Sequence, residues 1–203
     1  MDNYGGAKYC SFPKTRYDRI PNFVGSEEAA KRLVSIECFS NSRVIKVNPD
    51  SPQRLVRRSL LEKGKTLLMP IPRLKNGFLI LLPSNVLDRD LSYASSIRGS
   101  FKYGTKAKIN ELPKVGGIVV GSVVVSTTGA RVGKARGYSD LDYSILRELD
   151  LVNDSVPVAT TVHEVQITSD VPIEEHDVPV DYIVTPKRVI KTKTMHPKPK
   201  GMM

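Results

Sequence analysis

Apolar positions along the chain follow two periods, one typical of strands and one typical of helices. Short apolar runs that end in polar or turn residues predict buried strands at 43–47, 66–70, 78–82, 157–162 and 181–186. Apolar side chains three or four positions apart predict a helix that begins at Ser26. A second helix is predicted from Ser51 to Leu61, and Gly64 is the glycine expected to end it.

This alternation of strands and helices favours an α/β fold, a three-layer sandwich with a mostly parallel central sheet. We expect one such domain over 19–190, after an irregular N-terminal segment, 1–18. A basic, proline-rich tail, 191–203, is expected to be extended or loosely attached. The polar interval 88–114 predicts an irregular excursion with at most one short helix, which is a candidate cover for a ligand.

Length and composition agree with one domain inside the cell. The 203 residues, of which 40% are hydrophobic, suffice for one substantial core. No apolar stretch reaches the length of a membrane span and no signal peptide is apparent, so no membrane partner is expected. Cys10 and Cys38 lack metal or redox spacing, which favours free thiols and a cytoplasmic location.

The strongest functional signal lies in residues 118–150. The apolar run IVVGSVVVS leads into the loop GARVGKARGYSD and then into the amphipathic segment LDYSILREL. This order predicts a strand, a turn and a helix. Because anions bind at the carboxyl ends of parallel strands and at helix N-termini, the loop is a candidate anion site.

The loop spaces three glycines and three cations in a pattern suited to phosphate. Glycine recurs at every fourth position, which permits positive φ angles and close backbone approach to a bulky anion. Arginine offers a planar fork of donors and lysine a mobile charge, so the set favours a polyphosphate over a single carboxylate. The residues are Gly129, Gly133, Gly137, Arg131, Lys134 and Arg136.

Acidic residues follow the loop directly. Asp140 and Asp142 fall in the first turns of the predicted helix, where a carboxylate is ordinarily a dipole partner or a cap. The alternative for Asp140 is a magnesium ion shared with substrate phosphates. Ser139 is predicted to be the helix N-cap in preference to a catalytic hydroxyl.

The loop is neither a P-loop nor a dinucleotide fingerprint, but it resembles the GxRxGxGxGYYD signature of 5-formyltetrahydrofolate cyclo-ligases. Tyr138 and Asp140 match that signature together with Arg131 and the three glycines. Similar stretches, RIPNF, EKGKTLLMPIPRL and PIEEHDVPVDYIVTP, extend the resemblance over roughly residues 16 to 190, most closely to the archaeal-type branch of the family.

The resemblance implies a cyclo-ligase fold and a site for ATP, Mg²⁺ and a reduced folate. In the family, ATP phosphorylates the formyl oxygen, a second folate nitrogen attacks the activated carbon, and phosphate leaves. Arg131, Lys134 and Arg136 would stabilise charge on the transferring phosphoryl group, within a nucleotide site that includes the three glycines and Tyr138. Asp140 would bind the metal. Arg73 follows a predicted strand and is either a ligand contact or a surface ion pair.

Three departures from the family pattern weaken a direct transfer of activity, and the one at Ser139 bears on the substrate more than on the nucleotide. Ala135 replaces a glycine, Ser139 replaces the second tyrosine of GYYD, and the usual N-terminal helix with its basic pair is missing. Two alternatives to cyclo-ligase activity therefore stay open. One is a catalytically degenerate relative that binds nucleotide or RNA, and the other is an ATP-using enzyme for a different formylated or carboxylated substrate.

A net charge of +10 makes nucleic acid a possible partner but does not favour it. The cations are dispersed apart from the loop and the tail, and aromatic residues for base stacking amount to only 6%. His163-Glu164 and His176-Asp177 lack metal-site spacing, and the residues around His176 are expected to fix a loop by hydrogen bonds. The sequence carries no signal for an oligomeric state.

Polar residues Asn48, Asp50 and Gln53 stand between a predicted strand and the following helix. They either face a polar ligand or cap that helix.

Overall fold

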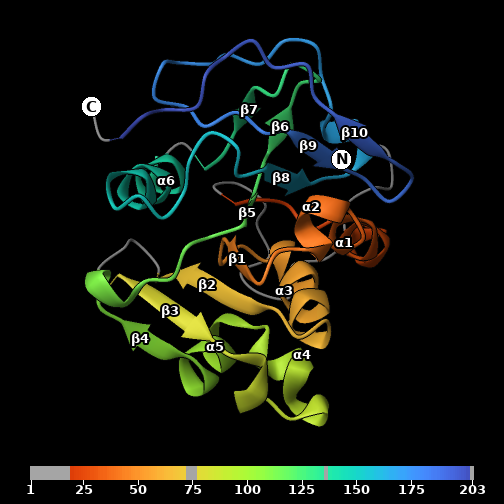
Figure 1. The fold of residues 1–203 in the computed structure, drawn as a ribbon. Coiled ribbons are helices and arrows are strands. Elements are labelled where there is room, and N and C mark those ends of the chain that lie inside the picture. The colour runs from red at the N-terminus through yellow and green to blue at the C-terminus, as the bar shows by residue number, and fades with distance from the viewer. Residues whose placement is uncertain (1–18, 72–76, 135–136, 202–203) are drawn as a thin grey trace.

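The computed structural model describes residues 19–71, 77–134 and 137–201, and an eight-stranded sheet crosses them (Figure 1). The strands are β1 (Val44–Val47), β2 (Thr66–Pro70), β3 (Phe78–Leu81), β4 (Thr105–Ala107), β5 (Gly117–Val120), β8 (Val158–Thr161), β9 (Tyr182–Val184) and β10 (Val189–Lys191). Their order is β10-β9-β8-β5-β1-β2-β3-β4. The five strands from β9 to β2 are mutually parallel, and antiparallel pairs form both edges. The predicted mostly parallel α/β sheet is confirmed.

Helices cover both faces of this sheet (Figure 1). Helices α1 (Ser26–Val34) and α3 (Gln53–Glu62) bury their apolar stripes in one hydrophobic cluster with β1 and β2. Helix α6 (Tyr138–Glu148) packs Tyr143 and Leu146 into a second cluster on the opposite face. Every residue of β5 and β8 is buried, because a parallel strand between two helical layers has no exposed face. The sandwich of three layers follows.

Both predicted helices near the N-terminal end of the described chain are confirmed. Helix α1 begins at Ser26, and the short helix α2 (Glu37–Ser40) follows it before β1. Helix α3 ends before Gly64, whose φ of +70° is the left-handed conformation that favours glycine at this position.

The apolar run after residue 117 does not form one continuous strand. Strand β5 ends at Val120, and a two-stranded hairpin of β6 (Val124–Val125) and β7 (Arg131–Val132) follows. Gly121 marks the break, since a Cβ there would lie only 2.8 Å from Asp50 Oδ2. Gln166 Nε2 donates to the carbonyls of Ser122 and Val123, both at 3.0 Å. These two backbone carbonyls therefore have hydrogen-bond partners without a neighbouring strand.

The interval 88–114 is more regular than its sequence predicts. It contains helices α4 (Leu91–Ala94) and α5 (Ile97–Tyr103) as well as the edge strand β4, so the prediction of at most one short helix is wrong. Small residues allow the two helices to touch: a Cβ on Gly99 would lie 1.8 Å from the carbonyl oxygen of Tyr93. No residue of this interval lines the main cavity of the described chain, so it does not cover that cavity.

The C-terminal segment is attached to the sheet rather than loose. Strand β10 pairs with β9, and the next residues continue the contact through backbone hydrogen bonds. Lys198 Nζ, nearly buried, forms an ion pair with Asp181 at 2.7 Å and donates to the carbonyl of Val156 at 2.8 Å. Of the two expected forms of the tail, extended or loosely attached, the second is therefore wrong over the described part. The segment 1–18 lies outside the described residues.

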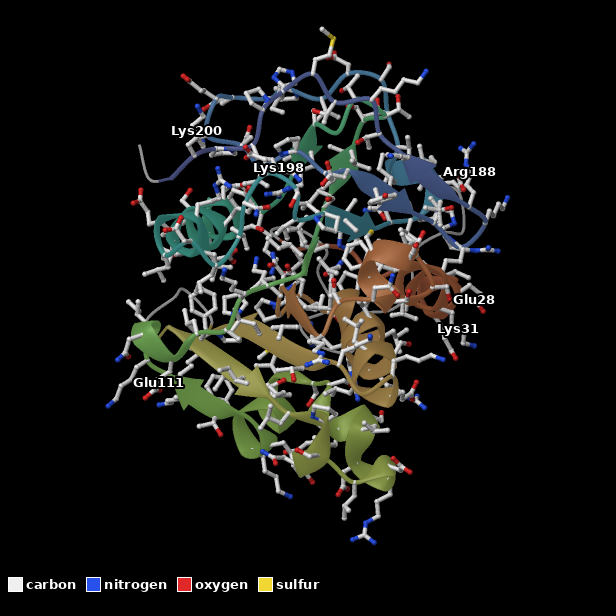
Figure 2. All side chains as sticks on the ribbon, in the orientation of Figure 1. Glu28, Lys31, Glu111, Arg188, Lys198 and Lys200 are labelled. Atoms are coloured by element: carbon white, nitrogen blue, oxygen red, sulfur yellow. The ribbon has the colours of Figure 1, made fainter. Side chains whose placement is uncertain are left out.

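Charged side chains are spread over the whole surface in view (Figure 2), with Lys31, Glu111, Arg188 and Lys200 at separate borders of the molecule. This agrees with the dispersed cations of the sequence. None of the helices within the described ranges combines the length and the apolar character needed to cross a bilayer.

Replacement of Gly99 by alanine is expected to destabilise the fold by about 1–3 kcal/mol, because the new Cβ would force the backbones of α4 and α5 apart. Urea unfolding of Gly99→Ala and of the parent measures the difference. Gly64→Ala is the control: its Cβ meets open space, so only the positive φ costs free energy, about 1 kcal/mol. Equal stability of Gly99→Ala and the parent would contradict the close packing.

Candidate functional site

A cavity of about 660 Å³ opens at the carboxyl ends of β1, β2 and β5. The chain leaves β1 toward β2 on one side, whereas β5 lies on the other side of β1, so the strand order reverses here. Open α/β sheets bind ligands at such a switch point. The lining residues are Ile20, Asn48, Pro49, Asp50, Pro70, Ile71, Gly121, Arg131, Val132, Gly133, Lys134, Gly137, Tyr138, Ser139, Asp140, Asp142, Pro172, Glu174, His176 and Asp177.

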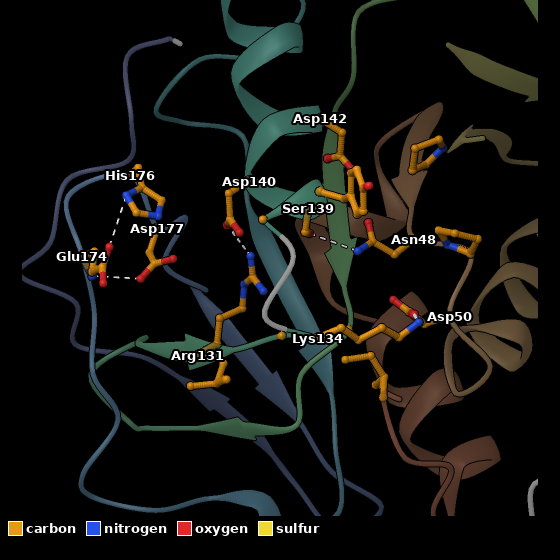
Figure 3. Close-up of a pocket in the computed structure, with 18 of the residues that line it drawn as sticks. Asn48, Asp50, Arg131, Lys134, Ser139, Asp140, Asp142, Glu174, His176 and Asp177 are labelled. Atoms are coloured by element: carbon orange, nitrogen blue, oxygen red, sulfur yellow. Dashed lines mark hydrogen bonds and ion pairs between the residues drawn. The ribbon is translucent and has the colours of Figure 1, made fainter. Parts of the chain in front are cut away.

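Two of the predicted phosphate-binding cations meet at this cavity, each with a carboxylate partner (Figure 3). Arg131 extends from β7, has a nearly buried side chain and forms an ion pair with Asp140. Lys134, which is 39% exposed, forms an ion pair with Asp50 at the end of β1. A bound phosphate would therefore share these cations with Asp140 and Asp50 or displace the carboxylates.

Asp140 lies in the first turn of α6 and accepts two contacts through the same oxygen. Its Oδ1 pairs with Arg131 and accepts the backbone N–H of Val178 at 3.1 Å. Neither contact uses Oδ2. The carboxylate thus joins the hairpin, the helix and the loop before β9.

The glycines of the loop have different roles. Gly137, with φ of +62°, occupies the N-cap position of α6 and lines the cavity. Gly129 has a φ of +91° in the hairpin turn, where a Cβ would lie 2.8 Å from the carbonyl of Val180, and it does not line the cavity. Gly133 lines the cavity and does not use the positive φ that a glycine permits.

The first residues of α6 also differ from the prediction. Ser139 is not the N-cap, because Gly137 holds that position and the helix begins at Tyr138. The Ser139 hydroxyl accepts a hydrogen bond from Asn48 Nδ2 at 3.0 Å. Tyr138 is 39% exposed and lines the cavity as expected for a ligand contact.

A buried ion pair joins the centre of the sheet to α6. Lys46 of β1 is fully buried, pairs with Asp142 and donates to Asn48 Oδ1 at 2.6 Å. Burial lowers the pKa of Lys46 and raises the pKa of Asp142 to about 6, against their mutual attraction. No pattern in the sequence predicted this pair. The available signal was a lysine inside a strand expected to be covered on both faces.

A second buried cation fixes the edge of the cavity. Arg57 of α3 donates through Nη1 to the carbonyls of Asn48 at 2.6 Å and Asp50 at 3.2 Å, and through Nε to that of Ser95 at 2.8 Å. Burial lowers its pKa to about 10, so the guanidinium stays charged at neutral pH. Arg57 therefore connects the α4–α5 unit to the loop after β1.

The polar residues after β1 divide as follows. Asn48 and Asp50 line the cavity, as one of the two interpretations requires. Gln53 is buried and donates to Thr161 Oγ1 at 3.3 Å, and Pro52 holds the N-cap position of α3 without a side-chain cap.

The wall opposite α6 comes from the loop before β9. Asp177 Oδ2 accepts the backbone N–H of Glu174 at 2.8 Å, and His176 Nδ1 lies 3.6 Å from Glu174 Oε2. The expected loop-fixing hydrogen bond is present, and these side chains also line the cavity (Figure 3). Within the described ranges, no group of three or more His, Cys, Asp or Glu residues is arranged to hold a metal ion. Arg73, Ala135 and Arg136 lie outside the described residues.

Comparisons with known proteins agree with the family resemblance of the loop. The profile of the 5-formyltetrahydrofolate cyclo-ligase family matches residues 13–186. Methenyltetrahydrofolate synthase domain-containing proteins of Mus musculus and Homo sapiens are 42% identical over 197 residues and 39% identical over 196 residues. The matches cover 95% and 94% of this chain but 53% and 51% of those proteins, so the chain spans about half the length of these relatives.

A solved structure, the 5,10-methenyltetrahydrofolate synthetase of Aquifex aeolicus, has a similar fold. Its TM-score is 0.52 at 20% sequence identity, over 82% of this chain and 80% of that chain. The curated relatives are animal proteins, which corrects the expected likeness to the archaeal-type branch.

Removal of one partner of the Lys46–Asp142 pair is expected to cost about 3–5 kcal/mol of stability, because the other charge stays buried alone. Lys46→Met and Asp142→Leu test this by urea unfolding, and the double variant should lose less than the sum of both. Lys31→Met, at an exposed pair with Glu27, should change stability by less than about 1 kcal/mol. Strictly additive losses would contradict direct pairing.

The raised pKa of Asp142 predicts a pH dependence of stability. The folded protein binds this proton more tightly than the unfolded chain, because burial raises the pKa from 3.8 to about 6. Protonated Asp142 therefore contributes to the free energy of unfolding below about pH 4, and this contribution is lost as the pH rises through about 6. Unfolding free energies of the parent and of Asp142→Asn over this range should diverge, with the flatter profile in the variant. Parallel profiles would oppose the prediction.

Proposed function

Because the chain belongs to the 5-formyltetrahydrofolate cyclo-ligase family, we propose that it cyclises 5-formyltetrahydrofolate to 5,10-methenyltetrahydrofolate with Mg-ATP. The observation that carries the proposal is the meeting of Arg131, Lys134 and Asp140 at the switch point of the sheet, beside the N-terminus of α6.

The phosphate side of the cavity is assigned to Arg131, Lys134 and the start of α6. A guanidinium carries five N–H donors, and the Asp140 contact engages the Nη2 end of Arg131. Arg131 Nε is buried without a hydrogen-bond partner among the described residues. Gly137 at the N-cap directs the first turn of α6 toward the cavity, and the partial positive charge of a helix N-terminus favours phosphate. The residues therefore fit a nucleotide.

The magnesium side is assigned to Asp140. Mg²⁺ in nucleotide sites commonly binds one or two carboxylates and completes its shell with phosphate oxygens and water. The Asp140 Oδ2 atom, which neither Arg131 nor Val178 engages, suits that role. A single carboxylate beside a phosphate-binding loop is thus compatible with the metal, although no larger ligand cluster is found in the described ranges.

Bound ATP would supply the phosphoryl group that turns the formyl oxygen into a leaving group. The protein would position that group and stabilise its charge through Arg131 and Lys134, since phosphoryl transfer depends mainly on placement and electrostatics. Arg136 is proposed for the same task and Arg73 for nucleotide contact. Gly133, Gly137 and Tyr138 would shape the nucleotide site, and Gly129 would act indirectly by forming the hairpin turn.

A second candidate is an ATP-using enzyme for a different formylated or carboxylated substrate. It is favoured by the polar wall of Asn48, Ser139 and Asp142, where the family signature has a second tyrosine at the position of Ser139. A catalytically degenerate relative would bind ATP without forming product.

The full chain incubated with 5-formyltetrahydrofolate, ATP and Mg²⁺ is expected to form the methenyl product, followed by its near-ultraviolet absorbance. Arg131→Ala should lower kcat/KM by roughly 10- to 100-fold, the equivalent of about 1.5–3 kcal/mol for a charge-assisted contact. Asp140→Asn should raise the Mg²⁺ concentration needed for half-maximal rate.

Arg58→Ala is the matched control, because Arg58 is exposed on α3 and pairs with Glu62 away from the cavity. It should retain the parent's activity. ATP binding without product would support the degenerate relative, and product from another formylated compound would support the second candidate. Full activity in Arg131→Ala would refute the assigned phosphate site.

A further inference from the structure

The cavity has a second polar wall that phosphate binding does not use. Asn48, Ser139 and Asp142 lie together on the side of β1, whereas Arg131 and Asp140 face the loop before β9 (Figure 3). Apolar residues also line the cavity: Pro49, Pro70 and Ile71 at the ends of β1 and β2, and Ile20 from the segment before α1. Apolar side chains beside a few fixed polar groups are typical of pockets for small organic ligands.

The direction of the hydrogen bonds in this wall is set by Lys46. An ammonium group only donates, so the oxygen of the Asn48 amide must face Lys46 Nζ, at 2.6 Å. The amide nitrogen must then face Ser139, and it donates to Ser139 Oγ at 3.0 Å. The two ends of the Asn48 amide are thus assigned from their hydrogen-bond partners, since the oxygen and the nitrogen have nearly the same shape.

Ser139 is consequently left with a hydrogen to donate. Its oxygen accepts from Asn48, and among the described residues no acceptor is found for its hydroxyl hydrogen. Ser139 is only partly buried and lines the cavity, so an acceptor atom of a ligand can take this hydrogen in place of water. A carbonyl oxygen accepts this hydrogen, whereas an amino group at the same place can only donate to the remaining lone pair of the serine oxygen and leaves the serine hydrogen to water.

We propose that Ser139, oriented by Asn48 and Lys46, is a specificity-determining residue that selects a ring carbonyl over an amino group in the second substrate. The inference rests on the proposed function, because it assigns the folate half of the same cavity. Asn48 and Lys46 are positioning residues in this scheme, since they act through Ser139. The substrate class is a heterocycle with a carbonyl at its polar edge.

The test compares two ligands on the full chain with Mg-ATP present. One is 5-formyltetrahydrofolate, and the other is its 2,4-diamino analogue, in which an amino group replaces the ring carbonyl. The parent should bind the carbonyl compound roughly 5- to 10-fold more tightly, as expected for one hydrogen bond of about 1 kcal/mol. Ser139→Ala should reduce this ratio to near unity without a change in the affinity for Mg-ATP.

Asn48→Asp tests the direction of the network. An aspartate can still accept from Lys46, but its second oxygen also accepts, so Ser139 must turn its hydrogen away from the cavity. The ligand preference should then shift toward the amino compound. In the double variant with Ser139→Ala this shift should vanish, which separates an effect through Ser139 from the added charge.

Ser144→Ala is the matched control, because Ser144 is a buried serine of the same helix that does not line the cavity, and its ligand ratio should equal that of the parent. An unchanged ratio in Ser139→Ala, or a shift by Asn48→Asp that persists without Ser139, would overturn the inference even if the parent is active. A parent that binds neither ligand would overturn the proposed function and the inference together.

Discussion

The ion pair between Lys46 and Asp142 is the interaction on which the arrangement of the site depends. It connects the central strand β1 to α6, two elements far apart in the sequence. Asn48 and Ser139, which form a neighbouring contact between the same two parts of the chain, are 91 residues apart. Because both charges are buried, α6 can dock in only one rotation about its axis without leaving a charge unpaired. That rotation brings Tyr138, Ser139 and Asp140 to the cavity.

The charges of the cavity are balanced within the protein. Arg131 and Lys134 each contact a carboxylate, and those carboxylates belong to different walls. Ligand phosphates would enter a site whose donors are already oriented, so little side-chain order has to be created on binding. The same pairing means that a ligand must compete with Asp140 and Asp50, and a metal ion that engages a released carboxylate would assist that competition.

Local patterns in the sequence predicted β1, β2, β3, β8 and β9, the helices α1, α3 and α6, and the position of the loop, because burial imposes a period on each of these elements. Arg131, Lys134, Gly137 and Tyr138 were assigned to a ligand site from spacing and family resemblance, and the fold brings them to one cavity. Whether they act as assigned stays a prediction.

Contacts between distant segments could not be predicted in the same way. The N-cap at Gly137 in place of Ser139 follows from a positive φ that a sequence pattern does not reveal. The packing of α4 against α5 depends on the absence of a side chain at Gly99. In the sequence, the same glycine counted as a sign of irregular structure in 88–114. Lys46 finds its partner only when α6 is docked on the sheet.

The outermost strands have a consequence for the behaviour of the folded molecule in concentrated solution. Strands β4 and β10 each have three residues, and each includes a lysine, Lys106 or Lys191. Short borders that carry positive charge are poor templates for a strand from another molecule. The sheet thus limits its own growth, which protects this α/β protein against intermolecular aggregation through its open edges.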